Sequence, residues 1–376
     1  MAAPADGADP APSEQQHWYR KLGSPRHVLA PMVDQSECAY RVLCHRHNVG
    51  LCYSPMLSSK QFADSKLYRD SMFTDVDGTG EDRPLVVQFA GNDPQILLAA
   101  AKHVQHRCDA VDINFGCPQK IARRGHYGAW LLDEPKLMCE LVSTLHCHLD
   151  CPVTAKIRRL PSRSSTVDLA RALQGAGASV IAVHGRTREQ KGALQGAADW
   201  DEIAAVKAAV SVPVFANGGI YSMRDVEACL AATGADGVMS GEGLLCNPAL
   251  FDDTAAGDAP EELALEYIAL QADYPSDLRS VKQHLFSLCY AGLQVYVDLR
   301  TSMHKARTLE EMHQIVLELR SRPRETRAPF CNAPGGGYTG WYKRHTWEET
   351  RRAAKQQAAE ANAPAACDAD GGDAGY

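Results

Sequence analysis

Cys117 is the residue with the clearest potential for chemistry, because Gly116 and Pro118 hold it in a loop directly after a buried strand. The stretch from Val111 to Leu132 reads VDINFGCPQKIARRGHYGAWLL and runs from that strand into the loop. A thiol with a pKa of about 8.5 is protonated at neutral pH and can act as an acid on a bound ligand. Cysteine is often only a small core residue, but its place between Gly and Pro favours the acid.

Two glycine-bearing loops predict a phosphate site. The segments Asn217-Gly218-Gly219 and Gly241-Glu242-Gly243 each follow a predicted strand. Bare backbone N–H groups in such loops, with the N-terminus of the next helix, can bind an anion. Either glycine pair alone could be a tight turn. Their occurrence at two consecutive strand ends therefore indicates a phosphorylated ligand or cofactor.

These residues need a fold that brings the ends of many strands together. Short apolar runs alternate with helical patterns, and helices that begin at Pro, Ser or Asp are predicted at 94–106, 135–145, 165–175, 199–209 and 222–232. The predicted strands are His27–Val33, Leu51–Leu57, Leu85–Gly91, Ala110–Gly116, Pro152–Arg158, Ser179–Gly185, Pro213–Gly219 and Gly237–Gly243. Such strand–helix units predict an α/β fold, a (β/α)8 TIM barrel, with the active site at the C-terminal ends of the strands. A doubly wound sheet is disfavoured, because no Gly-x-Gly-x-x-Gly follows the first strand.

The motifs around Cys117 resemble those of the flavin-dependent tRNA dihydrouridine synthases. The signature strand of that family ends in Asn-x-Gly-Cys-Pro, here Asn114 to Pro118, and a Gly-Ala-x-Leu follows, here Gly128 to Leu131. The run from Cys117 to Ala129 is similar to the eukaryotic branch assigned to uridines 16 and 17 of the tRNA D-loop. The resemblance implies an FMN-dependent reductase, re-reduced by NADPH or NADH, that converts uridine to dihydrouridine. Hydride would go from FMN to C6, and the proton from Cys117 to C5.

The resemblance also implies which residues hold FMN. The matching positions are Pro31, Met32, Val33, Gln88, Asn114, Lys156, His184, Asn217, Gly218, Gly219, Gly241 and Glu242. A flavin needs polar partners along its pyrimidine edge and a positive charge near N1, which suits Lys156. A salt bridge to Asp112 is the alternative role for Lys156. Many family members carry Gly-Arg at Gly241-Glu242; since a carboxylate repels phosphate, we expect the Glu242 side chain to point away.

The chain divides into four predicted segments. Residues 1–22 form a disordered arm, 23–257 the FMN-binding barrel, 258–328 a helical tRNA-binding domain and 329–376 a mostly disordered tail. The basic side chains expected to contact RNA are Arg123, Arg124, His126, Arg186, Arg188, Lys282, Arg300, Lys305 and Arg307.

Composition limits the other possibilities. No apolar run is long enough for a membrane span, and the acidic start lacks the pattern of a secretory signal. Thirteen scattered cysteines indicate reduced thiols, and His146, Cys147, His148 and Cys151 lack zinc-ligand spacing, so we expect no metal. The expected protein is a cytoplasmic monomer, with the nucleus as a second location.

Two other functions are compatible with these residues. One is an FMN barrel acting on a free pyrimidine, as a dihydroorotate dehydrogenase does, which has no use for a basic helical domain. The other is a non-catalytic RNA-binding or chaperone-like protein, for which Cys117 would be dispensable.

Overall fold

The computed structural model describes residues 14–73, 80–252 and 260–323 of the chain. The predictions for residues 1–13 and for the tail 329–376 lie outside these ranges. The strands are β1 (His27–Leu29), β2 (Leu51–Tyr53), β3 (Leu57–Ser58), β4 (Leu85–Ala90), β5 (Ala110–Phe115), β6 (Val153–Arg158), β7 (Val180–His184), β8 (Val214–Asn217) and β9 (Gly237–Ser240).

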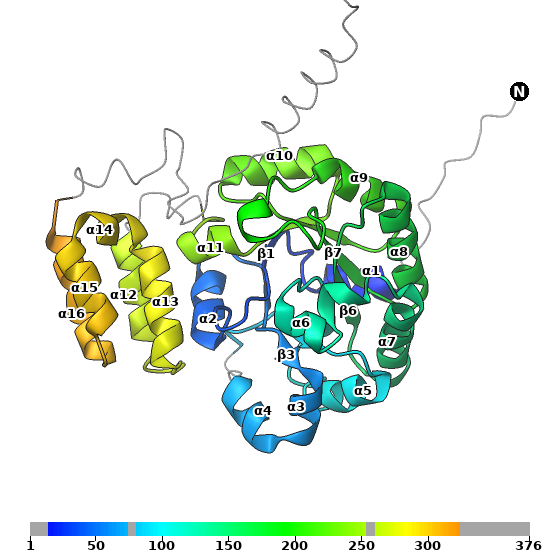
Figure 1. Ribbon diagram of the computed structural model, residues 1–376, viewed down its shortest axis with the longest axis horizontal. Helices are drawn as coiled ribbons and strands as arrows, with labels where there is room; N and C mark the ends of the chain where they lie inside the picture. Colours follow the sequence, from blue (N-terminus) through cyan, green and yellow to red (C-terminus); the bar gives the residue numbers. More distant parts are fainter. Residues whose placement is uncertain (1–13, 74–79, 253–259, 324–376) are drawn as a thin grey trace, which may run out of the picture.

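The strands close into a parallel barrel. Each of β1, β2 and β4 to β9 pairs in parallel with its neighbours, and the pairing of β2 with β4 completes the ring. Figure 1 shows helices arranged around these strands. They are α2 (Cys38–Arg46), α3 (Ser59–Asp64), α4 (Lys66–Met72), α5 (Pro94–Lys102), α6 (Lys120–Arg124), α7 (Pro135–His148), α8 (Arg163–Gly175), α9 (Trp200–Ala209), α10 (Met223–Thr233) and α11 (Glu242–Cys246), with the 3-10 turns η1 (Gly128–Leu131) and η2 (Gly192–Leu194). The predicted TIM barrel is confirmed.

Prolines shorten two of the predicted strands. The strand predicted from His27 to Val33 ends at Leu29, because Pro31 has no N–H for the ladder. The strand predicted from Leu51 to Leu57 is divided into β2 and β3, with Pro55 between them. At that break the hydroxyl of Ser54 accepts a bond of 3.0 Å from the N–H of Gln88 and so replaces a ladder partner.

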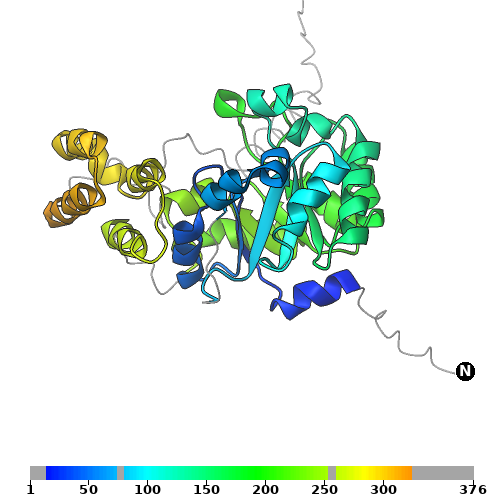
Figure 2. The same ribbon diagram turned by 90° about the horizontal axis from the view of Figure 1, so that it is seen from below.

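The expectation of a disordered arm up to residue 22 is wrong for its last part. Residues Glu14–Lys21 form helix α1, which Figure 2 shows outside one end of the strands. Tyr19 is buried, its ring lies 5.9 Å from that of Phe215 inside the barrel, and its hydroxyl donates to the carbonyl of Pro25. Burial of this aromatic ring fixes the helix, because it removes a large apolar surface from water.

A helical domain lies beside the barrel. It contains α12 (Pro260–Leu270), α13 (Leu278–Leu288), α14 (Tyr290–Val295), α15 (Val297–Lys305) and α16 (Leu309–Ser321), which agrees with the predicted helical region. Figure 1 shows these helices next to α2 and α11, and contacts join α12 to α2 and α13 to α11. The helical domain therefore touches the barrel close to the ends of its first and last strands.

Candidate active site

The interior of the barrel changes from apolar to polar along the strands. Alternate residues of each strand face inward, and the cluster Val28, Leu51, Tyr53, Val86, Ala110, Val180, Ala182, Phe215 and Met239 fills the first part of the interior. The inward positions that follow are polar: Gln88, Asp112, Asn114, Thr154, Lys156, Arg158, His184 and Asn217. Buried polar groups of this number need partners or a polar ligand.

A cavity of about 480 Å³ opens at this polar end of the barrel. Its lining includes the predicted cofactor residues Pro31, Met32, Lys156, His184, Asn217, Gly218, Gly219, Gly241 and Glu242. Three others lie elsewhere: Val33 is 52% exposed, while Gln88 and Asn114 are buried in a hydrogen-bond network. The structure therefore brings nine of the twelve residues to one cavity.

Asn114 holds the loop that carries Cys117. Its side-chain oxygen accepts bonds from the N–H groups of Gly116 (3.0 Å) and Cys117 (2.8 Å). Its amide nitrogen donates to Gln88 (2.7 Å), whose own amide nitrogen donates to Asp112 (2.7 Å). Because each carboxamide has its oxygen and nitrogen fixed by its neighbours, the network has one consistent orientation. Asn114 thus positions the thiol loop.

Three further contacts shape the Cys117 loop. The guanidinium of Arg158 donates to the carbonyl of Gly116 (2.7 Å), and the ammonium of Lys191 donates to that of Pro118 (2.7 Å). Gly128 has φ +67°, and a Cβ there would lie 2.8 Å from the carbonyl oxygen of Cys117. Only glycine fits at that position. Cys117 itself is partly exposed, so it is open to a ligand.

Lys156 is a buried ammonium at the floor of the cavity. Its Nζ donates to Oδ1 of Asn217 (2.9 Å), whereas Asp112 accepts from Gln88 and Thr154. Burial, with the nearby Arg158, lowers the pKa of Lys156 to about 8. Burial raises the pKa of Asp112 to about 6. Lys156 is therefore bonded to the neutral amide of Asn217, and not to Asp112 as in the alternative role.

The first of the two glycine loops has a left-handed backbone that favours glycine. Gly218 and Gly219 have φ of +107° and +84°, and a Cβ on Gly218 would lie 2.8 Å from that of Ala198. In the second loop Gly241 has φ −113°, which any residue can adopt. Glu242 lines the cavity, and its carboxylate accepts a bond of 2.9 Å from the hydroxyl of Tyr221. The side chain of Glu242 is thus held by a neighbour within the same wall.

From the sequence, Arg186 was placed among the RNA contacts, but the structure does not put it on a surface that RNA could reach. It is 3% exposed and lines the cavity, where it donates to the carbonyl of Gly196 (3.0 Å) and lies 3.2 Å from Nε2 of His184. Burial lowers the pKa of Arg186. Burial, together with Arg158, Lys156 and Arg186, lowers the pKa of His184 well below its usual value. Arg186 therefore adds a third buried cation to the lining of the cavity, besides Lys156 and Arg158.

The side chains of the other predicted RNA contacts differ in their exposure to solvent. Arg123, Arg124, His126, Lys305 and Arg307 are exposed, whereas Arg188, Lys282 and Arg300 are half-buried. Arg188 pairs with Asp133 (2.7 Å), and both Arg188 and Arg123 stack on the ring of Trp130.

Further contacts occupy some of these side chains. The ammonium of Lys282 donates to the carbonyls of His304 (3.0 Å) and Ala306 (2.6 Å), so it caps the end of α15. Nε2 of His126 lies 2.7 Å from a carboxylate oxygen of Glu134, and Arg300 donates to Gln294 (3.2 Å).

Sequence reasoning gave no role to Arg158 and Tyr221, and it placed Arg186 among the RNA contacts. Arg158 follows Lys156 by two residues and Arg186 follows His184 by two, so the two-residue period of a strand places each pair on one side. That parity was the available signal. Tyr221 lies in the loop after β8. Its hydroxyl donates to Glu242 at the start of α11, and the sequence gives no sign of that contact.

None of the helices in residues 14–73, 80–252 and 260–323 is long and apolar enough to cross a membrane. Within the same ranges no group of His, Cys, Asp or Glu side chains is arranged to hold a metal ion.

Comparison with known proteins agrees with this arrangement. The family model described as dihydrouridine synthase (Dus) matches residues 28–322. The chain is 47% identical over 327 residues to a Mus musculus protein named as a tRNA-dihydrouridine(16/17) synthase (NAD(P)(+))-like protein, with 85% of this chain and 68% of that protein covered. A Schizosaccharomyces pombe tRNA-dihydrouridine(16/17) synthase (NAD(P)(+)) is 41% identical, with 81% and 80% covered. A human tRNA-dihydrouridine(20a/20b) synthase (NAD(P)+)-like protein is 37% identical, with 69% and 80% covered. With its family model matched over most of its length, the chain belongs to the dihydrouridine synthase family.

Proposed function

We propose that this protein reduces uridine to 5,6-dihydrouridine at positions 16 and 17 of the tRNA D-loop, with FMN as cofactor and NADPH or NADH as electron donor. The observation that carries the proposal is a cationic cavity beside the Cys117 loop, in a dihydrouridine synthase barrel. The higher identity to the proteins named for positions 16 and 17 than to the one named for 20a and 20b supports the choice of position.

The residues around the cavity fit FMN. Lys156, Arg158 and Arg186 are buried cations, and Glu242 is the carboxylate in the same lining, so an anionic ligand is needed for balance. Bare N–H groups of Gly218, Gly219 and Gly241, with the Arg186 guanidinium, would hold the phosphate. Lys156 and His184 would face the ring, and the backbone of Pro31 to Val33 would lie against it. When bound, reduced FMN supplies the hydride that adds to C6 of the uracil.

Cys117 would supply the proton that C5 takes. Its loop is held by Asn114 and Arg158. A proton donor at a fixed position contributes about 100-fold or more to such a reaction. The target base must leave its stack to reach the cavity, and the exposed Arg124, Lys305 and Arg307 would hold the RNA backbone.

The test is the reduction of unmodified tRNA. The protein is incubated with tRNA, FMN and NADPH, and dihydrouridine is located by mass mapping. We expect product at positions 16 and 17, and a loss of about 100-fold or more in Cys117→Ala, with FMN and tRNA still bound. Cys147→Ala, which removes an exposed thiol on α7, should match the wild type.

The same experiment separates the alternatives. Equal reduction of free uracil or uridine without tRNA would favour a free-pyrimidine reductase. Undiminished product in Cys117→Ala would remove Cys117 as the acid, and tRNA binding without any flavin would favour a non-catalytic RNA-binding protein.

A further inference from the structure

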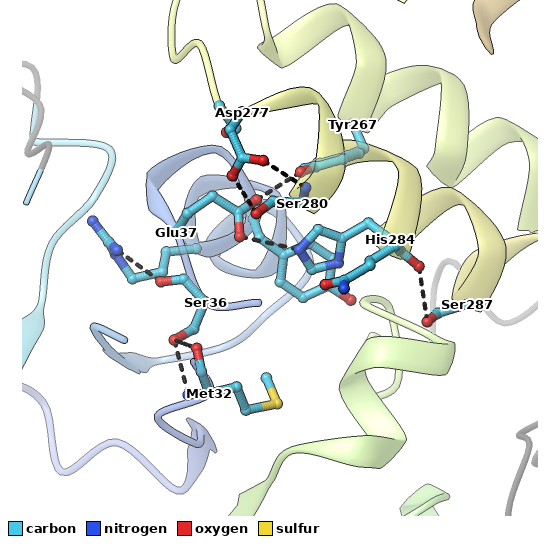
Figure 3. A network of polar contacts seen from close by, with 12 residues as sticks. Met32, Ser36, Glu37, Tyr267, Asp277, Ser280, His284 and Ser287 are labelled. Carbon is cyan, nitrogen blue, oxygen red and sulfur yellow. Dashed lines mark hydrogen bonds and ion pairs between the residues drawn. The ribbon is translucent and has the colours of Figure 1, made fainter. Parts of the chain in front are cut away.

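Glu37 joins the helical domain to the barrel through two partly buried hydrogen bonds. Glu37 precedes α2, and its carboxylate accepts from the hydroxyl of Tyr267 on α12 (2.6 Å) and bonds with Nε2 of His284 on α13 (3.0 Å). Figure 3 shows both side chains converging on Glu37 from the helical domain. Tyr267 and His284 are fully buried. The carboxylate therefore has both partners only when α12 and α13 are seated against α2.

An aromatic cluster surrounds this junction and extends to α11. The ring of Tyr40 stacks on His284 at 3.9 Å between ring centres and meets Tyr267 edge-on at 5.7 Å. The hydroxyl of Tyr40 donates to the carbonyl of Leu244 (2.6 Å), within the short helix that begins at Glu242. The helical domain is thus connected to the segment that follows the Gly241 loop.

A second connection runs from Glu37 to Met32 in the lining of the cavity. The hydroxyl of Ser36, the neighbour of Glu37, accepts from the N–H of Met32 (3.0 Å) and donates to its carbonyl (3.1 Å). Arg41 donates to the carbonyl of Ser36 (2.8 Å). Met32 lines the cavity, and its sulfur lies 3.2 Å from the position that a Cβ on Gly241 would take. Figure 3 shows Met32 and Ser36 on the same side of Glu37.

We propose that Glu37 is a positioning residue that couples tRNA binding on the helical domain to cofactor binding in the barrel. This inference rests on the proposed function. If the helical domain moves, the partly buried Glu37 carboxylate loses both of its partners, and such a loss is costly. The domain, the 31–36 loop and α11 therefore have one joint arrangement. A ligand that favours this arrangement from either side favours binding of the other, by the same factor in both directions.

A second interdomain contact provides a matched control. Nε2 of His47, which follows α2, lies 2.9 Å from Glu266 on α12. This contact also ties the helical domain to the barrel, but it lies beyond the other end of α2 from Glu37. Breaking it removes a bond between the domains and leaves the Glu37, Ser36 and Met32 connection in place.

The experiment measures the affinity for FMN by quenching of its fluorescence, with and without saturating tRNA. In the wild type we expect tRNA to tighten FMN binding by about fivefold or more. In Glu37→Ala that factor should fall to about one, whereas His47→Gln should keep it. Glu37→Ala removes a whole carboxylate and could disturb the fold. Tyr267→Phe is therefore the second variant, because it keeps the ring and loses only the hydroxyl. It should reduce the factor to an intermediate value.

Three results would overturn the coupling. They are a wild type in which tRNA leaves FMN affinity unchanged, a Glu37→Ala variant that keeps the wild-type factor, and a His47→Gln variant that loses it to the same extent. Each leaves the proposed function intact, because FMN and tRNA still bind. A protein that binds no FMN would instead contradict the proposed function.

Discussion

The ammonium of Lys156 on β6 donates a hydrogen bond to the side-chain oxygen of Asn217 on β8, across the strand β7 that lies between them. The side-chain nitrogen of Asn217 donates in turn to the carbonyl of Met239 (2.9 Å), which fixes its oxygen toward the lysine. The cation is therefore aimed at the cavity without a carboxylate as its direct partner, and it is available to a ligand with negative charge.

Affinity for FMN should fall as the pH rises through about 8. Burial lowers the pKa of Lys156 to about 8, so the ammonium is present below that pH and lost above it. Because the attraction for an anionic ligand is lost with the charge, the affinity for FMN should decrease by up to about tenfold for each further pH unit.

The stability of the protein without FMN should change with pH in the opposite direction. Since the usual pKa of lysine is 10.5, the cost of burying the cation decreases between pH 8 and 10.5 and stability rises.

Lys156→Gln is the control for this pH dependence. It should bind FMN more weakly at pH 7 and show a flat profile between pH 7 and 9, measured by flavin fluorescence. A profile in Lys156→Gln with the wild-type slope would assign the titration to another group.

Asn114→Ala should loosen the Cys117 loop and destabilise the protein. The substitution leaves the N–H groups of Gly116 and Cys117 and the oxygen of Gln88 without their partner. Unsatisfied buried groups cost about 1 to 3 kcal/mol each, so we expect a loss of about 2 kcal/mol or more in urea unfolding. Alkylation of Cys117, followed by peptide mass mapping, should become faster.

Asp93→Ala provides the comparison for that variant. Asp93 caps α5 by accepting from the N–H groups of Gln95 and Ile96 (both 2.9 Å), away from the cavity. Its loss should cost about 1 kcal/mol and leave alkylation of Cys117 unchanged. Equal alkylation rates in the two variants would mean that Asn114 does not hold the thiol loop.

Arg186→Gln should weaken FMN binding and leave riboflavin binding nearly unchanged. Arg186 is a buried cation near the glycine loops, and riboflavin differs from FMN by the missing phosphate. A hydrogen bond to a charged group contributes about 1.5 to 3 kcal/mol, so a loss of about 10- to 100-fold for FMN is expected. Arg163→Gln, which removes a half-exposed guanidinium paired with Glu202, should affect neither ligand. Equal losses for FMN and riboflavin would exclude a phosphate contact.

The barrel could be predicted well from the sequence, because the patterns that indicate its strands, helix starts and loops are local. Eight apolar runs, the helix starts and the two glycine loops are each visible within a few residues. Arg186 was assigned to RNA together with Arg188, as basic residues after the sixth predicted strand, although Arg186 is buried beside His184 in the cavity. The role of Lys282 could not be predicted, because its partners are carbonyls of His304 and Ala306, and only the folded domain brings them near.

The helical domain should bind tRNA through Lys305 and Arg307, and not through Lys282. Lys305 and Arg307 are exposed, so Lys305→Glu with Arg307→Glu should weaken tRNA binding. The slope of affinity against salt should also decrease by about one for each phosphate that the protein no longer neutralises. Lys282→Met removes a cation from the C-terminal end of α15, where it is favoured by the helix dipole. That variant should lose about 1 to 2 kcal/mol of stability and keep the wild-type salt slope. A changed slope in Lys282→Met, or an unchanged slope in the double variant, would contradict this assignment, and titrations of tRNA at several salt concentrations measure both.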